Sequence, residues 1–247
     1  MSEVINGIGL CKEKILFNVD ISIKKGEMVA IMGPSGSGKS TLLYQLSGMD
    51  IPDAGQVIFD GNDICTYSED RRAEERLNKM GFVFQQMNML PNLNIIDNIV
   101  FPALERQKRK RVNRKAEAQI REEALSLMNK VGIRGLEKRK ITEVSGGQLQ
   151  RACICRAIMN QPKLLLADEP TGALNISATR DVMDILTMLN KEGTSILLVT
   201  HDSRVASYCK RILYMTDGKI CRELSLDEHI YRTQEQREEK VKQWVEF

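Results

Sequence analysis

The residues best suited to chemistry stand in one short stretch, GPSGSGKST, at positions 33–41. The stretch matches the pattern G-x-x-x-x-G-K-S/T, in which glycines let backbone N–H groups surround phosphate oxygens. Lys39 is expected to reach the β- and γ-phosphates of a nucleotide, and Ser40 to offer its hydroxyl to Mg²⁺. The predicted phosphate-binding residues are Gly33, Pro34, Ser35, Gly36, Ser37, Gly38, Lys39, Ser40 and Thr41.

Two acidic residues, Asp168 and Glu169, end the apolar segment LLLAD. Carboxylates at the C-terminal end of a parallel strand lie where open α/β sheets bind their ligands. Asp168 is therefore expected to hold Mg²⁺ through water, and Glu169 to orient and deprotonate an attacking water molecule. An Asp-Glu pair alone is typical of a solvated loop, so this interpretation depends on the phosphate-binding stretch.

A second glycine-containing stretch, VSGGQLQR, lies at 144–151. A hydroxyl, two glycines and the start of a helix can together hold an anion, because free N–H groups point outward at a helix N-terminus. Taken alone, the stretch is better explained as an ordinary helix that begins at a serine.

The segments that carry these residues alternate between strand and helix patterns. Apolar runs typical of buried strands lie at 28–32, 163–168 and 195–202, and helix patterns lie at 40–47 and 177–193. Such alternation indicates an α/β fold with a mostly parallel sheet.

From about 103 to 143 the sequence becomes charged and helix-favouring, with apolar residues at helical spacing. We therefore expect a helical subdomain, about 87–160, inserted into an α/β domain of residues 1–225. A charged helical tail at 226–247 is expected to follow. The tail carries Trp244, so it is expected to be either a solvated terminal helix with a small apolar edge or a docking helix for a partner.

Net charge, cysteine spacing and the length of apolar runs bear on nucleic-acid binding, metal binding and membrane insertion. The chain has 247 residues and a net charge of +3, which is too small by itself to indicate nucleic-acid binding. Six cysteines are scattered, and Cys153 and Cys155 have no histidine nearby at zinc spacing, so free thiols are expected. No apolar run approaches the roughly 20 residues of a membrane helix. If the function involves a membrane, another chain is expected to supply the span.

Several motifs, in order over about residues 10–225, resemble those of the ATP-binding subunit of ABC transporters. FVFQQ (82–86) is similar to the Q-loop, VSGGQ (144–148) to the signature sequence, LLLADEP (164–170) to the Walker B strand, GALN (172–175) to the D-loop and THD (200–202) to the switch-histidine motif. The resemblance implies a P-loop NTPase core, an N-terminal antiparallel β subdomain and an inserted helical subdomain.

The resemblance also implies a role for each motif residue. Gln85 is expected at Mg²⁺ and in catalysis, His201 at the γ-phosphate, and Glu169 and Lys39 in hydrolysis of ATP. Members of the family hold two nucleotides between two subunits arranged head to tail. The signature residues of one copy are therefore expected to close on the nucleotide of the other, and they are Ser145, Gly146, Gly147 and Gln148.

The stretches at 81–102 and 167–175 are most similar to ATPase subunits of lipoprotein-releasing, macrolide-exporting and bacitracin-type peptide-resistance systems. There the ATPase pairs with a membrane permease that has a large extracytoplasmic domain. The resemblance implies an ATPase at the cytoplasmic face of the membrane that powers export of, or resistance to, antimicrobial peptides or antibiotics, or lipoprotein release. Four apolar residues are expected either to receive a permease helix or to pack inside the subdomain: Met87, Met89, Leu90 and Leu93.

Two positions depart from the family pattern. The upstream aromatic that stacks on adenine has no counterpart in residues 7–14, where Leu10 or Cys11 falls near its place, so looser base selectivity is expected. The D-loop ends in Asn175 instead of Asp, which keeps hydrogen bonding but loses a charge. The basic run at 106–115 is expected to be a solvated helix face with a secondary attraction to anionic lipid. No nucleic-acid partner is expected, because no aromatics interleave with the run.

Two other classes of protein remain as alternatives. A soluble ABC-type ATPase of iron–sulfur cofactor assembly would associate with soluble scaffold proteins instead of a permease. A nucleic-acid-associated ABC protein tends to carry a long coiled coil or two ATPase units in one chain, and neither is seen in this sequence.

Overall fold

The computed structural model describes residues 2–108, 114–227 and 229–246, so part of the basic run, 109–113, lies outside the described residues. The strands are β1 (Glu3–Lys12), β2 (Leu16–Lys24), β3 (Met28–Met32), β4 (Ala54–Phe59), β5 (Asn62–Asp63), β6 (Met80–Phe84), β7 (Leu164–Asp168), β8 (Ser195–Val199), β9 (Arg211–Thr216) and β10 (Lys219–Ser225). The helices are α1 (Lys39–Leu46), α2 (Glu69–Lys79), α3 (Ile95–Lys108), α4 (Arg114–Lys130), α5 (Gly146–Ile158), α6 (Ile176–Lys191), α7 (Ser203–Ala206) and α8 (Gln234–Val245).

Ten strands form two sheets in the described part of the chain. One sheet has four antiparallel strands in the order β2-β1-β4-β5. The other has six strands in the order β10-β9-β3-β8-β7-β6, and its pairs are parallel except for β9 with β10. The α/β fold with an antiparallel N-terminal sheet and a mostly parallel core sheet, expected from the sequence, is confirmed.

The central strands are almost entirely apolar because both faces of the sheet are covered. All five residues of β3 and all five of β8 are buried. The carboxyl ends of neighbouring strands meet at one edge, where Asp168 pairs in register with both Phe84 and Val199. This edge collects the polar residues that follow the strands.

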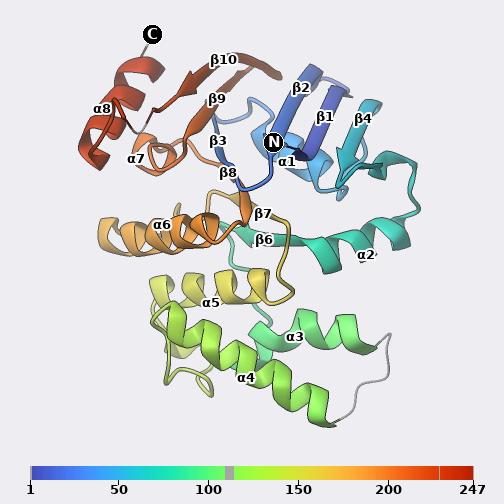
Figure 1. The fold of residues 1–247 in the computed structure, drawn as a ribbon, viewed down its shortest axis with the longest axis vertical. Coiled ribbons are helices and arrows are strands. Elements are labelled where there is room, and N and C mark those ends of the chain that lie inside the picture. The colour runs from blue at the N-terminus through green and yellow to red at the C-terminus, as the bar shows by residue number, and fades with distance from the viewer. Residues whose placement is uncertain (1, 109–113, 228, 247) are drawn as a thin grey trace.

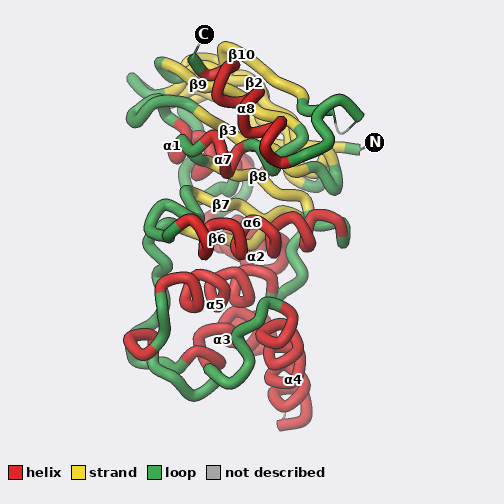
Figure 2. Tube along the Cα trace, turned by 90° about the vertical axis from the view of Figure 1, so that its left-hand side faces the viewer, coloured by secondary structure: helices red, strands yellow, loops and turns green. Residues whose placement is uncertain are grey.

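Three helices, α3, α4 and α5, pack together at the end of the molecule opposite the antiparallel sheet (Figures 1 and 2). In both views α6 lies above α5, at the level of β6 and β7. The buried apolar side chains fall into two clusters. One joins the helical end to a face of the core sheet, and the other joins the opposite face to the antiparallel sheet and α1.

One expected boundary was wrong. Residues 195–202 were expected to form a single strand, but β8 ends at Val199. The Thr200 hydroxyl and the Asp202 carboxylate accept hydrogen bonds from the backbone N–H groups of Asp202 and Arg204, so these side chains take over from strand pairing and begin α7.

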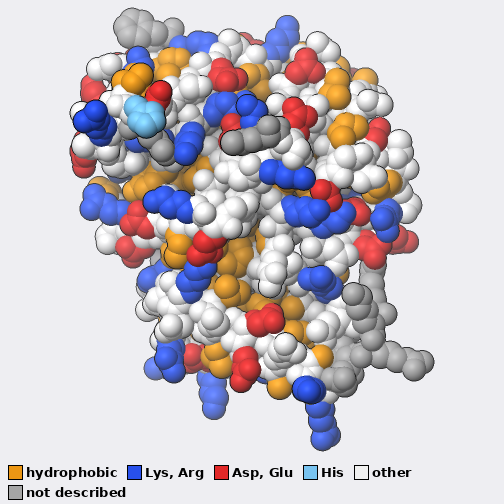
Figure 3. Space-filling model, in the orientation of Figure 1, with side chains coloured by type: hydrophobic (Ala, Val, Ile, Leu, Met, Phe, Trp, Pro, Cys, Tyr) orange, Lys and Arg blue, Asp and Glu red, His pale blue; other side chains and the backbone are white. Residues whose placement is uncertain are grey.

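The C-terminal helix α8 packs on its own chain. Val241 is fully buried, and the Trp244 ring lies edge-on to Tyr214 at 5.9 Å with the Arg222 guanidinium 5.0 Å from its centre. The apolar edge of this helix is therefore used within the chain. Among the described residues, no helix is both long and apolar enough to cross a bilayer. Acidic and basic side chains are interspersed on the face that Figure 3 presents.

Candidate functional site

The phosphate-binding stretch joins β3 to α1, as its sequence pattern predicts. Gly38 begins α1 in the left-handed conformation (φ 96°) and no side chain caps this helix. The first N–H groups of a helix have no partners within it, so the start of α1 offers free donors to an anion. Ser37 adds a buried hydroxyl that has no hydrogen-bond partner among the described residues.

Gly33 permits the tight path of this loop. A β-carbon there would lie 2.0 Å from the Met215 carbonyl oxygen, and its φ is 147°. The Lys39 ammonium is buried and donates hydrogen bonds to the carbonyl oxygens of Gly33 (2.9 Å) and Pro34 (2.7 Å). Burial lowers the pKa of Lys39, while the charges of Glu169 and Asp168 act in the opposite direction. The ammonium group of Lys39 is thus held against the backbone of the phosphate-binding loop.

Ser40 and Asp168 are 128 residues apart in sequence but meet in the fold, where the Ser40 hydroxyl donates a 3.1 Å hydrogen bond to the carboxylate. Burial raises the pKa of Asp168, and the hydrogen bond from Ser40 opposes that shift. Oxygen atoms of this type suit Mg²⁺, which takes one or two protein oxygens together with substrate phosphates. The two residues therefore fit the metal site that the sequence predicts.

Tyr44 is a member of this group that sequence analysis missed. The Tyr44 phenol lies close enough to the Asp168 carboxylate to interact with it, and burial together with this neighbouring charge raises the pKa of the phenol. A residue four positions after Ser40 lies on the same helix face, so the spacing within α1 was a signal that could have identified it.

Glu169 and His201 lie directly beside the metal-site residues. The Glu169 carboxylate is largely buried, and its Oε1 lies 2.7 Å from Nδ1 of the exposed His201 ring. Because an ionised carboxylate only accepts hydrogen bonds, the ring nitrogen is the donor. Glu169 has a φ of 47°, a left-handed backbone that is uncommon for a residue other than glycine and is often found at functional sites.

Gln85 follows β6 at the same sheet edge and its side chain packs against Gly172. A β-carbon at Gly172 would lie 2.8 Å from Gln85 Nε2. Sequence analysis did not single out Gly172, although its place in the D-loop stretch was visible. The next D-loop residue of interest, Asn175, caps α6, since its side chain accepts a 2.9 Å hydrogen bond from the Ala178 N–H.

The signature stretch begins α5. Ser145 and Gln148 form a reciprocal capping box, with hydrogen bonds of 3.3 Å and 2.9 Å between side chain and backbone. Gly147 lies against α6, because a β-carbon there would be 3.0 Å from the β-carbon of Ala178. In Figure 1, α5 and α1 lie on opposite sides of β6 and β7. The structure thus assembles the phosphate loop, Gln85, Asp168, Glu169 and His201 in one region and leaves the signature stretch apart from it.

The position near the expected adenine contact holds Cys11, which is half-buried and accepts a 3.3 Å hydrogen bond from the Asn18 N–H. Phe17, the first aromatic of the chain, lies in β2 and is exposed. Neither residue reproduces an aromatic at the family position.

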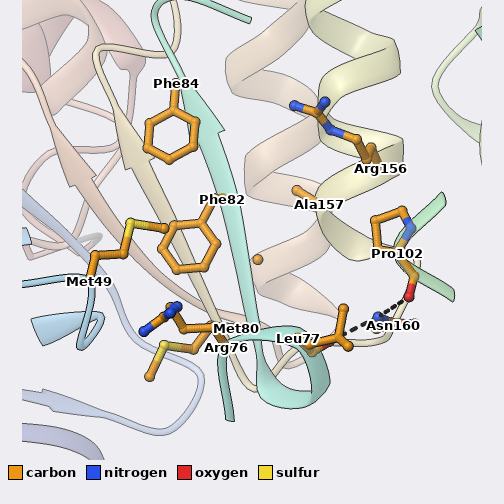
Figure 4. Close-up of a pocket in the computed structure, with 11 residues that line it drawn as sticks. Met49, Arg76, Leu77, Met80, Phe82, Phe84, Pro102, Arg156, Ala157 and Asn160 are labelled. Atoms are coloured by element: carbon orange, nitrogen blue, oxygen red, sulfur yellow. Dashed lines mark hydrogen bonds between the residues drawn. The ribbon is translucent and has the colours of Figure 1, made fainter. Parts of the chain in front are cut away.

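A largely apolar pocket opens where the core meets the helical end of the molecule. Phe82 and Phe84 stack on one side of β6, with ring centres 5.9 Å apart, and face α5 residues across the pocket (Figure 4). Asn160 fixes the far wall through hydrogen bonds to the carbonyl oxygens of Leu77 and Pro102. The lining residues are Met49, Arg76, Leu77, Met80, Gly81, Phe82, Phe84, Pro102, Arg156, Ala157 and Asn160.

The apolar residues after Gln85 are mostly used for internal packing. Met89 is buried and Met87 packs against the same core cluster. Arg156 donates hydrogen bonds to the carbonyl oxygens of Met87 and Asn88, which hold this segment on α5. Leu90 is exposed.

A comparison with sequence families decides the identity of this fold and site. The profile described as ABC transporter matches residues 16–172. This chain belongs to the ABC transporter family.

Similar proteins define this ABC cassette further. The chain is 40% identical, over 217 residues, to the ABC transporter ATP-binding protein YxdL of Bacillus subtilis, covering 87% of this chain and 82% of YxdL. It is 41% identical to the macrolide export ATP-binding/permease protein MacB of Escherichia coli over 83% of this chain, but it spans only 31% of the length of MacB. These similarities confirm the expected ABC ATP-binding subunit and do not favour the iron–sulfur assembly alternative.

Solved structures of ABC cassettes have the same fold as this chain. The dimeric structure of MJ0796, described as a bacterial ABC transporter cassette, has a TM-score of 0.82 and 38% identity, and covers 90% of this chain and 99% of that one. MJ0796 in a post-hydrolysis state bound to ADP and Pi matches with a TM-score of 0.80 and 35% identity over the same shares.

Proposed function

We propose that this cassette binds and hydrolyses ATP as a head-to-tail dimer and thereby drives a separate membrane permease. One observation carries the enzymatic part of the proposal: Ser40, Asp168, Glu169 and His201 converge beside the phosphate loop through contacts of 2.7–3.1 Å. The similarity to MJ0796 bound to ADP and Pi supports the same chemistry.

Different residues of the chain bind the phosphates, hold the metal ion and accept the proton. The loop N–H groups and Lys39 would hold the phosphates. Ser40 and Asp168, with Gln85, would hold Mg²⁺, which when bound would supply positive charge to the phosphates. Glu169 accepts a proton from water as the water oxygen bonds to the γ-phosphorus and the bond to the bridging oxygen of ADP breaks. The His201 ring turns away from Glu169 and then contacts the γ-phosphate.

The site needs a second copy to be complete. Ser145, Gly146, Gly147 and Gln148 start a helix away from their own phosphate loop, and exposed Ser145 offers this helix start to another molecule. In the proposed dimer these residues close on the nucleotide of the partner. The dimeric MJ0796 cassette supports this arrangement.

The permease is proposed to dock in the pocket before Gln85. MacB is named as both ATP-binding and permease protein, and this chain matches 31% of its length, which supports a permease as the partner of this cassette. The apolar side chains of Phe82 and Phe84 in the lining of this pocket suit a short apolar helix. Phe84 pairs with Asp168 in the sheet, so a permease there lies one strand from the nucleotide site.

A permease partner also implies where the cassette lies in the cell and what the complex transports. The cassette would lie at the cytoplasmic face of the membrane, with a permease that carries an extracytoplasmic domain. The macrolide-export name of MacB favours antibiotic or antimicrobial-peptide export or resistance, with lipoprotein release as the second candidate.

Substitution of Glu169 by Gln tests the enzymatic proposal. Gln keeps the shape but cannot accept a proton, so phosphate release should fall by about 10²-fold or more while ATP still binds. ATP should also hold the variant as a dimer in size-exclusion chromatography. A matched control is Glu192→Gln, which alters an exposed carboxylate paired with Lys130. Normal hydrolysis by Glu169→Gln would remove Glu169 from the role of base.

A further inference from the structure

Thr200 stands between β8 and α7 and is completely buried. Its backbone N–H donates a 3.1 Å hydrogen bond to the carbonyl oxygen of Ile31 in β3. The residue is therefore fixed to the central strand that leads into the phosphate loop, and its side chain cannot move away without disturbing the sheet.

The direction of the Thr200 hydroxyl is set by its two neighbours. Its oxygen accepts a 3.1 Å hydrogen bond from the Asp202 N–H and lies 3.3 Å from Glu169 Oε2. A hydroxyl has one hydrogen, and the Asp202 N–H is itself a donor, so the hydrogen of Thr200 is directed to Glu169. The 3.3 Å separation is longer than an ideal hydroxyl–carboxylate bond, and contacts of this kind often tighten when the substrate is bound.

Glu169 needs such support because its backbone is unusual. Its φ of 47° is costly for a residue with a side chain, and its N–H donates a 2.9 Å hydrogen bond to the Val199 carbonyl oxygen. Val199 immediately precedes Thr200. The end of β8 thus holds Glu169 twice, through a main-chain bond and through the Thr200 hydroxyl.

The two carboxylate oxygens have partners of different kinds. Oε1 contacts His201, whose side chain is 72% exposed, whereas Oε2 contacts the buried Thr200. We propose that Thr200 is a positioning residue that keeps Oε2 of Glu169 in place when His201 turns to the γ-phosphate. Oε1 is then the oxygen that receives the proton of water. The inference rests on the proposed role of Glu169 as base.

The test compares Thr200→Val, which keeps the shape and removes the hydroxyl, with Thr200→Ser, which keeps the hydroxyl. Thr200→Val should lower kcat by about tenfold to hundredfold, because a misplaced catalytic group loses rate, while the Kd for ATP stays unchanged. Thr200→Ser should restore most of kcat. Thr187→Val is the matched control, since the Thr187 hydroxyl bonds to the Met183 carbonyl oxygen within α6. Thermal unfolding verifies that each variant is folded, and Thr200→Ala replaces Thr200→Val if the latter does not fold.

A double variant separates this inference from the proposed function. In the Glu169→Gln background, Thr200→Val should cause no further loss of kcat, because no base remains to be positioned. Unchanged kcat in Thr200→Val, or a full additional loss in the double variant, would overturn the role of Thr200 and leave Glu169 as base. Normal hydrolysis in Glu169→Gln alone would instead overturn the proposed function.

Discussion

The Ser40 hydroxyl donates a hydrogen bond to Asp168, and this contact joins the first helix after the phosphate loop to the end of a strand 128 residues later. Ser40 is held by α1 and Asp168 by β7, so both oxygens are positioned by the chain's own secondary structure. Such preorganisation reduces the cost of ordering side chains on binding.

Substitution of Asp168 by Asn should abolish hydrolysis without lowering the unfolding temperature. The buried carboxylate carries a desolvation cost, which a neutral amide of the same shape removes. We expect Asp168→Asn to unfold at a temperature no lower than the wild type without nucleotide, and to lose Mg²⁺-dependent hydrolysis. Differential scanning fluorimetry and phosphate release measure the two properties. A variant that is clearly less stable would show that the carboxylate is needed for the fold.

Substitution of Gly172 by Ala should impair activity more than folding. The added β-carbon would meet the end of the flexible Gln85 side chain at 2.8 Å, and this side chain can move aside. The unfolding temperature should therefore change little, whereas displacement of Gln85 should lower the hydrolysis rate by about tenfold or more. Full activity in Gly172→Ala would mean that Gln85 need not occupy this position.

Asn175 should matter for stability through its cap on α6. Asn175→Ala removes the acceptor for the Ala178 N–H and should lower the free energy of unfolding by about 1 kcal/mol. Asn175→Asp keeps a good cap and should leave stability nearly unchanged. Urea denaturation compares the two variants. Equal losses in both would show that the cap does not carry the effect.

The cysteines should differ in reactivity. Burial raises the pKa of Cys153 to about 11 and of Cys155 to about 12, while Cys221 is exposed. Because the thiolate is the reactive form, Ellman's reagent at pH 8 should modify Cys221 quickly and the two buried thiols only after unfolding. Loss of the fast signal in Cys221→Ser checks the assignment.

The same raised pKa values predict how stability depends on pH. The folded state keeps the protons of Cys153 and Cys155 more tightly than the unfolded state, whose thiols titrate near 9. The free energy of unfolding should therefore fall as the pH rises from 9 towards 11. Urea denaturation across this range measures the slope, which should be smaller in Cys155→Ala; an identical slope would contradict the prediction.

The proposed docking pocket can be tested at Met49, which lines it and is 43% exposed. A carboxylate there would oppose an apolar helix without disturbing the core. Met49→Asp should release the protein from the membrane fraction of the source cells into the soluble fraction, with ATP binding retained. Ile230→Asp is the control, because Ile230 is 66% exposed and does not line the pocket. Equal membrane association of both variants would place the permease elsewhere.

The sequence by itself determined the chemistry and the class of fold. The phosphate-binding pattern carries its own mechanism, because glycines, a lysine and a helix start suffice to hold phosphates. The alternation of apolar strands and amphipathic helices predicted the mostly parallel sheet, because burial on both faces requires apolar runs. Ser145 also predicted the start of α5, since a capping side chain acts within a few residues.

Only the tertiary structure decided which side chains touch. The hydrogen bond of Thr200 to Glu169 depends on the register of β7 and β8, which no local pattern encodes. The same holds for Met87 and Met89, whose apolar character suits a docking surface and a core equally well. Burial against α5 decided for the core, because packing depends on which elements meet in space.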